Sequence, residues 1–200
     1  MRVITGSAKG RRLKTLPGID VRPTTDGVKE AIFSIVQFEV EGAVVLDLFA
    51  GSGQLGIEAL SRGASKVIFV DNSAESIKVV KDNLQNTRLE ENAVVINTAN
   101  NAFLRSTREK FDIAILDPPY NHNLIQKSMP QLVEKMAEGG IIICEHEKET
   151  VLPESFGDFS VSKVYRHGRA TLTAYRKNVK NTDEDTEIAD ISDNLEGNED

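Results

Sequence analysis

Asp117, Pro118, Pro119 and Tyr120 stand directly after an apolar, partly β-branched run at 113–116. Such a run predicts a buried strand, and the two prolines end its pairing because they lack an N–H. The carboxylate of Asp117 and the carbonyl of Pro118 are two acceptors on a stiff turn, which suits them to hold both hydrogens of an amino group and aim its lone pair at an electrophile. The Tyr120 ring offers a face to an unstacked base. These four residues therefore predict a catalytic clamp for the exocyclic amine of a nucleobase.

A second chemical pattern lies earlier in the chain. Gly51, Gly53 and Gly56 match G-x-G-x-x-G where a predicted strand runs into a predicted helix, so the chain can turn tightly and approach a ligand closely. Asp71 ends the next predicted strand, where a carboxylate can accept hydrogen bonds from ribose hydroxyls. Asp47, which ends the strand before the loop, would repel a pyrophosphate but suits an ammonium group. The pattern favours S-adenosylmethionine, which carries both adenosine and an amino-acid ammonium, over NAD.

The elements that must position these residues alternate between strand and helix signals. Candidate strands lie at 44–49, 66–70, 93–97, 112–116, 140–144, 160–165 and 171–175, and candidate helices at 55–62, 74–87 and 124–136. This alternation predicts an α/β fold with a mainly parallel sheet covered on both faces. Ligands bind beyond the carboxyl ends of such strands, so we expect Asp47, Asp71 and Asp117 to meet at one edge. Gly168, in the short turn between the last two strands, predicts an antiparallel hairpin near the sheet edge.

Charge is distributed unevenly along the 200 residues, whose net charge is −7. The segment 178–200 is strongly acidic, polar and without aromatic residues, whereas the first 22 residues are basic and could neutralise phosphates. We predict three parts: a basic N-terminal extension at 1–41, the main domain at 42–177, and a disordered acidic tail at 178–200. The extension combines a small hairpin around Gly6 and Gly10 with an amphipathic helix that begins after Thr24, Thr25 or Asp26.

Other sequence features exclude several classes of protein. No apolar run approaches the roughly 18 residues that cross a bilayer, and the N-terminus lacks the pattern of a signal peptide, so we expect a cytoplasmic protein. The single cysteine, Cys144, lies in an apolar run and predicts a core thiol. His146 stands between two glutamates but has no partner cluster, so we expect no metal site.

The motifs carry a resemblance to a known family. Residues 47–53, Asp-Leu-Phe-Ala-Gly-Ser-Gly, resemble motif I of the class I S-adenosylmethionine-dependent methyltransferases, and 117–120 resemble their amino-methylating signature. Residues 22–26, Arg-Pro-Thr-Thr-Asp, and 60–64, Leu-Ser-Arg-Gly-Ala, narrow the resemblance to the bacterial 16S ribosomal RNA guanine-N2 methyltransferases that modify guanine 966. It covers about 2–176. It implies a Rossmann-like, seven-stranded fold and a monomer that methylates 16S rRNA in the small subunit or an assembly intermediate.

The resemblance also implies roles for individual residues. The implied donor-binding residues are Asp47, Phe49, Ala50, Gly51, Ser52, Gly53, Asp71, Asn72, Asn101 and Ala102. The implied RNA contacts are Arg11, Arg12, Lys14, Arg22, Thr24 and Thr25. Asn101 departs from the aspartate that is common in relatives, although its amide oxygen can still accept a hydrogen bond from an adenine amino group.

Three other functions stay open on the sequence. A DNA adenine-N6 methyltransferase would use the same clamp, although 200 residues show no separate target-recognition domain. The glycine pattern taken alone suggests an NAD-dependent oxidoreductase, and the basic N-terminal segment taken alone suggests a non-catalytic RNA-binding protein. Methyl transfer to ribosomal particles against duplex DNA, and binding of NAD against S-adenosylmethionine, separate these possibilities.

Overall fold

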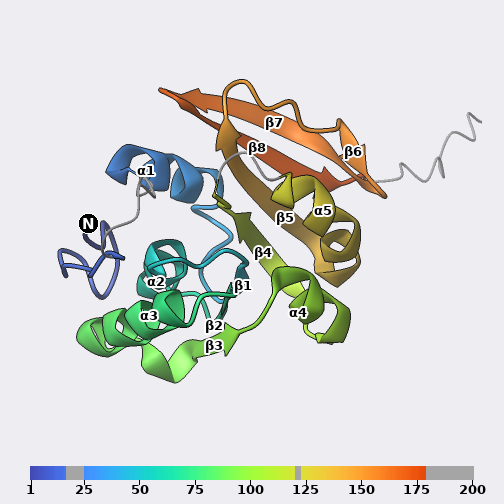
Figure 1. The fold of residues 1–200 in the computed structure, drawn as a ribbon. Coiled ribbons are helices and arrows are strands. Elements are labelled where there is room, and N and C mark those ends of the chain that lie inside the picture. The colour runs from blue at the N-terminus through green and yellow to red at the C-terminus, as the bar shows by residue number, and fades with distance from the viewer. Residues whose placement is uncertain (17–24, 120–122, 179–200) are drawn as a thin grey trace, which may run out of the picture.

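The computed structural model describes residues 1–16, 25–119 and 123–178 (Figure 1). Tyr120, Arg22, Thr24 and the predicted tail from 179 onward lie outside these residues. The elements in chain order are α1 (Asp26–Ile35), β1 (Val44–Asp47), α2 (Gln54–Ser61), β2 (Lys66–Asp71), α3 (Ala74–Thr87), η1 (Glu90–Asn92), β3 (Ala93–Asn97), α4 (Asn100–Ser106), β4 (Phe111–Leu116), α5 (Leu124–Leu132), η2 (Val133–Lys135), β5 (Met136–Glu147), β6 (Ser155–Phe156), β7 (Phe159–His167) and β8 (Ala170–Lys177).

The strands form one sheet in the order β3-β2-β1-β4-β5-β8-β7-β6. The first five strands of this order are parallel, and β8, β7 and β6 add antiparallel pairs at one side. The mainly parallel α/β sheet and the terminal antiparallel hairpin are therefore confirmed. All seven predicted strands are present, and within the described residues an eighth, the two-residue β6, extends the sheet beyond β7.

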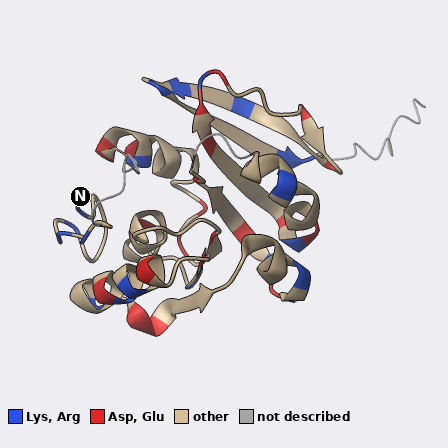
Figure 2. Cartoon of the chain, in the orientation of Figure 1, with Lys and Arg blue, Asp and Glu red and all other residues tan. Residues whose placement is uncertain are grey.

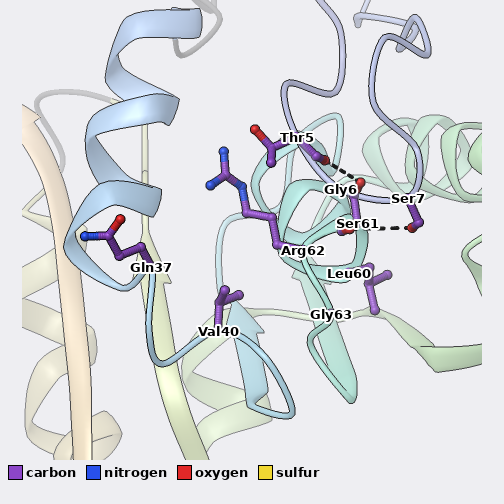
Figure 3. A pocket seen from close by; sticks show the side chains of 9 residues that line it. All are labelled: Thr5, Gly6, Ser7, Gln37, Val40, Leu60, Ser61, Arg62 and Gly63. Atoms are coloured by element: carbon purple, nitrogen blue, oxygen red, sulfur yellow. Dashed lines mark hydrogen bonds between the residues drawn. The ribbon is translucent and has the colours of Figure 1, made fainter.

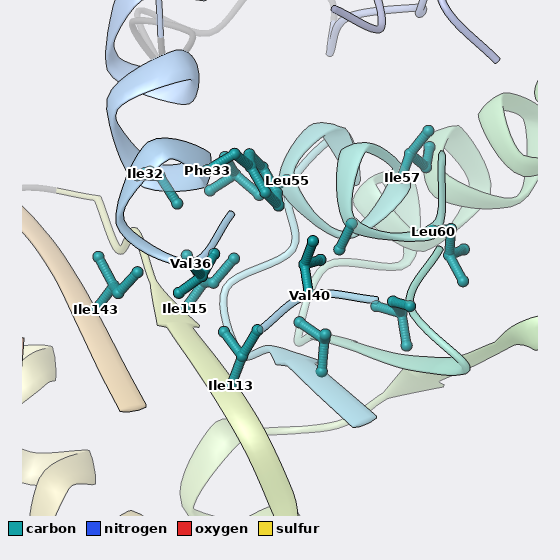
Figure 4. Packing of buried hydrophobic residues seen from close by; sticks show 14 of the residues in the cluster. Ile32, Phe33, Val36, Val40, Leu55, Ile57, Leu60, Ile113, Ile115 and Ile143 are labelled. Carbon is teal, nitrogen blue, oxygen red and sulfur yellow. The ribbon is translucent and has the colours of Figure 1, made fainter. Parts of the chain in front are cut away.

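Helices cover both faces of the sheet because alternate strand residues point to opposite sides. Ile113 and Ile115 of β4 belong to a buried cluster with α1, α2 and α3, part of which Figure 4 shows. Ala114 and Leu116, the residues that alternate with them, belong to a second buried cluster with α4 and α5. The inner parallel strands β1, β2 and β4 are buried on both sides, which explains why their sequences are continuous apolar runs rather than alternating ones. The outer parallel strand β3 is only partly buried.

The N-terminal segment folds back on itself but forms a single antiparallel bridge, between Arg2 and Arg12, instead of the predicted two-stranded hairpin. Its register is set by loop hydrogen bonds, and Gly6 and Gly10 take φ of 84° and 81° to make the turns. Val3, Ala8 and Leu13 of the segment are buried in the same cluster as α1 and α2. The segment is thus built into the main hydrophobic core.

Helix α1 begins as the sequence predicts. The hydroxyl of Thr25 accepts a hydrogen bond from the backbone N–H of Val28 at 3.3 Å and caps the helix. Val28 and Ile32 form a buried stripe on the helix, which the C-cap residue Val36 continues. Helix α1 therefore packs as an integral layer of the domain, on the same face of the sheet as α2 (Figure 1).

Candidate active site

The glycine loop between β1 and α2 is shaped by its backbone. Gly51 and Gly53 have φ of 53° and 78°, a left-handed conformation that glycine adopts without strain. Gly53 is the N-cap of α2. Gly56 serves packing instead, because a Cβ there would lie 2.2 Å from the ring of Phe69 on β2. The three glycines of the motif thus have two different physical roles: turning the chain and letting α2 lie close to the sheet.

Asp47 supports this loop from below. Its Oδ2 atom accepts a hydrogen bond from the Gly56 N–H at 3.0 Å, within the first turn of α2, and its side chain is buried. A carboxylate at this place satisfies one of the orphan donors of the helix N-terminus. Burial raises the pKa of Asp47 to about 7, the Gly56 hydrogen bond opposes that rise, and the nearby carboxylates of Asp117 and Asp71 add to it.

Asp71 closes the loop from the side. Its Oδ2 accepts a hydrogen bond from the Gly51 N–H and its Oδ1 accepts one from the Ser73 N–H, each at 2.8 Å. The end of β3 fixes the backbone of Asp71, whose carbonyl accepts hydrogen bonds from Thr98 N–H and from the Asn97 side chain, each at 3.0 Å. The Asp71 side chain is half-buried, so the carboxylate stays accessible at the edge of the sheet.

The three predicted acids meet at one edge. In the sheet register Asp47 pairs with Phe69 of β2 and with Ile115 of β4. Asp71 and Asp117 therefore lie two residues further along their strands, on either side of β1. The electrostatic effect of both carboxylates on Asp47 supports this proximity. The predicted convergence of the strand ends is thus present in the structure.

The predicted clamp is described as far as Pro119. Asp117 is half-buried, Pro118 is buried and Pro119 is exposed, immediately after β4 ends at Leu116. Pro118 and Pro119 border a pocket of about 200 Å³ whose other lining comes from the start of α5 and from the end of β5. The lining includes Glu145, His146, Glu147, Asn123, Leu124, Ile125, Gln126 and Thr150. A mostly polar pocket beside the turn can take a small planar polar group.

The contribution of β5 was missed by the sequence analysis, which treated His146 only as an incomplete metal site. Leu116 pairs with Cys144, so the residues after Cys144 rise beside Asp117 at the same edge. The His146 ring is buried and fixed by two contacts, Nδ1 with the Glu147 carbonyl at 2.9 Å and Nε2 with the Thr173 hydroxyl at 2.8 Å. Burial lowers the pKa of His146, which favours the neutral ring. The polar run at 145–147, directly after the apolar run at 141–144, was the feature of the sequence that could have indicated this contribution.

The remaining donor-binding predictions are placed as follows. Phe49, Gly51 and Ser52 are half-buried in the loop after β1, and Asn72 is exposed next to Asp71. Asn101 lies in the first turn of α4, where its Oδ1 accepts a hydrogen bond from the Ser128 hydroxyl of α5 at 3.5 Å. Ala50 and Gly53 are buried, and Ala102 is half-buried beside Asn101.

The predicted RNA contacts at residues 11–14 lie beside the glycine loop at 48–53, which we call the donor loop. Arg11 donates to the Asn86 carbonyl at 2.7 Å, and Lys14 forms a 2.9 Å ion pair with Asp82, so both side chains have partners on α3. The Lys14 hydrogen bond lowers the pKa of Asp82. Arg12 is exposed, and Thr25 is occupied as the cap of α1.

Asn83 of α3 connects this basic segment to the donor loop. Its side chain is fully buried. Its Oδ1 accepts a hydrogen bond from the Lys14 N–H at 2.7 Å, and its Nδ2 donates to the Lys14 carbonyl at 3.0 Å and to the Ser52 carbonyl at 2.9 Å. A single amide thus holds the backbone of both segments.

A larger pocket, of about 430 Å³, lies away from this edge (Figure 3). It surrounds the last turn of α2, and its lining includes Thr5, Gln37, Ser61 and Arg62. Helix α2 begins at the glycine loop and ends at Ser61, so this pocket is at the opposite end of the helix from the converging acids. Arg62 is engaged there by Glu58 at 2.8 Å and by the Phe33 ring.

The strand order, the glycine loop after β1 and the acid at the end of β2 define the Rossmann-like fold of the class I methyltransferases. The chain belongs to the family described as "Conserved hypothetical protein 95", whose model matches residues 1–176. Over the described residues, no helix is long and apolar enough to cross a membrane. No group of three or more His, Cys, Asp or Glu in that part of the chain is arranged to hold a metal ion.

Individual relatives are similar over most of their length. The chain is 42% identical to "Putative rRNA methyltransferase YlbH" of Bacillus subtilis (strain 168), over 88% of this chain and 99% of the relative. It is 32% identical to "Ribosomal RNA small subunit methyltransferase D" of Escherichia coli (strain K12), over 88% and 90%. The solved structure of "Putative methyltransferase yhhF from Escherichia coli" matches with a TM-score of 0.79 and 31% identity, covering 88% of this chain and 97% of that one.

Proposed function

We propose that this protein transfers a methyl group from S-adenosylmethionine to the exocyclic N2 amine of a guanine in 16S rRNA, at the position equivalent to guanine 966. The observation that carries the proposal is the convergence of Asp47, Asp71 and Asp117 at one edge of the sheet, with a polar pocket beside Pro118 and Pro119. The names of the relatives from B. subtilis and E. coli support rRNA, and for the second the small subunit, as the substrate.

The residues at the donor half fit S-adenosylmethionine. The half-buried carboxylate of Asp71 keeps lone pairs for ribose hydroxyls while it accepts two backbone N–H groups. Around Gly51, the nearest atom to an added Cβ would be 3.9 Å away, so the loop leaves room for a ligand. The negative field of three carboxylates suits the donor's ammonium group. When bound, S-adenosylmethionine supplies an electrophilic methyl group.

At the acceptor half, the chain's own groups hold and orient the amine. The lone pair of a guanine N2 is delocalised into the ring, so the amine is a weak nucleophile. The Asp117 carboxylate and the Pro118 carbonyl would accept its two hydrogens, which draws the nitrogen toward tetrahedral geometry. The stiff Pro118–Pro119 turn fixes these acceptors before the reaction. The 200 Å³ pocket beside the turn would take the base, with Tyr120 as its stacking partner.

The proposal includes the setting of the reaction. The substrate is the small ribosomal subunit or an assembly intermediate, the enzyme acts as a monomer in the cytoplasm, and no metal takes part. Asp117 orients the amine, and no residue forms a covalent bond with the methyl group. The proton of the methylated amine leaves to solvent or to an accessible carboxylate at the edge of the sheet.

The direct test uses methyl-labelled S-adenosylmethionine with three acceptors: small subunits from cells that lack this gene, the naked 16S rRNA, and duplex DNA. We expect label in the subunits, and N2-methylguanine at one position after digestion and mass spectrometry. Calorimetry with S-adenosylhomocysteine and with NAD measures cofactor binding separately. Absence of label in every particle, with S-adenosylhomocysteine still bound, would exclude the function; label in duplex DNA as N6-methyladenine would favour the DNA methyltransferase.

A further inference from the structure

The β7–β8 hairpin ends at the same edge of the sheet as the candidate active site. Glu147, the last residue of β5, pairs with Ala170, the first residue of β8, and Ala170 also pairs with His167. The turn of the hairpin therefore lies beyond the carboxyl end of β5. Strand β8 is two places from β4 in the sheet, which corresponds to about 10 Å at the usual strand spacing. The turn is within reach of a nucleic acid strand whose base occupies the pocket.

The turn is held in place by its sequence and by α1. Gly168 is the first of two turn residues and has a φ of 63°, as expected for the tight hairpin turn that takes glycine there. The His167 ring packs against the first turn of α1 so closely that a Cβ on Gly27 would lie 2.8 Å from its Nε2 atom. The hairpin thus presents its turn from a fixed position beside the start of α1.

Two exposed arginines stand at this turn: Arg166 lies in β7 just before it, and Arg169 is its second residue. Arg166 and Arg169 are both exposed, and neither guanidinium has a hydrogen-bond or ion-pair partner in the part of the chain that the structure describes. They differ in this from Arg11 and Lys14, whose side chains are engaged by α3. An arginine fork without a partner is well suited to a phosphate, which it can bind through two parallel hydrogen bonds.

The two basic regions lie on opposite sides of the site. Residues 11–14 pack on α3, near β2, whereas the hairpin turn adjoins β5 on the far side of β1 and β4. Figure 2 shows Lys and Arg on both the N-terminal loop and the turn end of the hairpin. A strand that crosses the pocket would meet cations on each side of its target base.

We infer that Arg166 and Arg169 form a second RNA-binding surface, which contacts backbone phosphates of the substrate on the β8 side of the target base. The inference rests on the proposed function for the identity of the partner. It extends the RNA-binding surface to the side of the site that the basic N-terminal segment does not reach. Because phosphates carry no sequence information, the surface contributes affinity and placement of the base rather than choice of base.

The test measures binding of the full-length protein to small subunits that lack the modification, at several salt concentrations, by filter binding. The variant is R166A/R169A, and the matched control is R105A/R108A, which removes two exposed arginines from the end of α4 and the loop that leads into β4. Like Arg166 and Arg169, these two have no side-chain partner among the described residues. R166K/R169K keeps both charges. Thermal unfolding and S-adenosylhomocysteine binding should be unchanged in all three, because none of these residues lies in the core or the donor loop.

We expect the Kd of R166A/R169A for subunits to rise about tenfold or more. Its slope of log K against log salt should flatten by about 0.7–0.9 for each lost phosphate contact, while R105A/R108A matches the wild type and R166K/R169K restores the slope. Equal Kd values and slopes for R166A/R169A and the control would overturn the inference. So would a raised Kd with an unchanged slope, which would indicate a contact with a protein component. If the wild type bound subunits but transferred no methyl group, the proposed function would be contradicted. The binding comparison between R166A/R169A and its control would still test the inference.

Discussion

The candidate active site has a donor half, around Asp47, Asp71 and the glycine loop, and an acceptor half, around Asp117 and the Pro118–Pro119 turn. Backbone groups shape the first and side chains shape the second. At the donor half, the Asp47 carboxylate accepts a backbone hydrogen bond from the first turn of α2, and the Asp71 carboxylate accepts backbone hydrogen bonds from the glycine loop and from the turn after β2. At the acceptor half, side chains from β5 and α5 line a pocket beside the Pro118–Pro119 turn. The first is a backbone structure that acids stabilise, and the second is a surface that side chains define.

This difference separates two kinds of dependence on sequence. Changes at the donor half disturb main-chain geometry, so they should alter stability and cofactor affinity together. Changes at the acceptor half should alter the rate and leave the fold intact, because Asp117 lies past the last paired residue of β4. Mutations that separate stability, affinity and rate therefore test whether the two halves are as distinct as their construction indicates.

The largest effect is expected at the acceptor half. Asp117→Ala should lower the rate of methyl transfer by about 10²-fold or more, because it removes one pre-positioned acceptor of the amine. Single-turnover kinetics on small subunits measures the rate, and calorimetry with S-adenosylhomocysteine should show nearly unchanged affinity. A variant that kept the wild-type rate would remove Asp117 from the clamp.

Asp71→Ala is the corresponding change at the donor half. We expect the Kd for S-adenosylhomocysteine to rise about 10- to 100-fold, because the ribose loses its carboxylate and the Gly51 and Ser73 N–H groups lose theirs. Asp71→Asn, which keeps one acceptor oxygen, should fall between this variant and wild type. Unchanged donor affinity in Asp71→Ala would show that the loop, rather than the acid, determines binding.

Gly56→Ala tests the backbone character of the donor half directly. The new Cβ would lie 2.2 Å from the Phe69 ring, so we expect a loss of about 1–3 kcal/mol in the free energy of unfolding. Gly51→Ala is the matched comparison, since its Cβ would meet nothing nearer than the Phe49 carbonyl oxygen at 3.9 Å and only the positive φ opposes it, at roughly 1–2 kcal/mol. Urea denaturation measures both. Equal stability of Gly56→Ala and wild type would show that α2 can move away from β2.

A further prediction is a pH dependence of stability that comes from Asp47. Its folded pKa is about 7 against an ordinary value of 3.8, so between these pH values the folded protein holds a proton that the unfolded chain releases. This group's contribution to stability therefore falls as pH rises from about 4 to about 7 and is constant above that. Asp47→Asn retains an acceptor for the Gly56 N–H and should remove this contribution. Urea denaturation from pH 5 to pH 8 gives the slopes.

Donor binding adds a second measurement at the same residue. A cationic donor beside the three carboxylates should lower the pKa of Asp47, so binding at pH 6.5 (about half a unit below that pKa) should release protons. Calorimetry in two buffers of different ionisation enthalpy detects the release. For the stability measurement, plots of the free energy of unfolding against pH that stay parallel for wild type and Asp47→Asn would contradict a proton on the buried Asp47 carboxyl.

Much of the framework could be predicted because it depends on local patterns. Apolar runs that end in an acid identified the parallel strands and the shared edge of Asp47, Asp71 and Asp117, and the glycine spacing located the loop. Helix α4 (Asn100–Ser106) was not predicted, since seven residues carry too short a pattern. Helix α5 was predicted to reach residue 136 but ends at Leu132, because a 3-10 turn follows and β5 already begins at Met136.

The rest of the site depends on contacts between segments far apart in the sequence. The end of β5 becomes part of the pocket only because β5 pairs with β4. Lys14 has an acidic partner only because the N-terminal segment packs on α3, where Asp82 lies. Charge and motif spacing predict which residues are available, but not which of them the fold brings together.

Through Asn83, the N-terminal segment also supports the donor loop, a structural role that its positive charge does not indicate. Shortening the chain to begin after Lys14 would leave a buried amide with only the Ser52 carbonyl to bind, directly beneath the donor loop. In such a truncated protein the donor loop would be less firmly held, so methylation would fall because cofactor binding is weaker. RNA contacts made by other segments would remain. Neutralising Arg12 alone keeps the Asn83 hydrogen bonds intact, so this substitution tests the role of the positive charge without disturbing the donor loop.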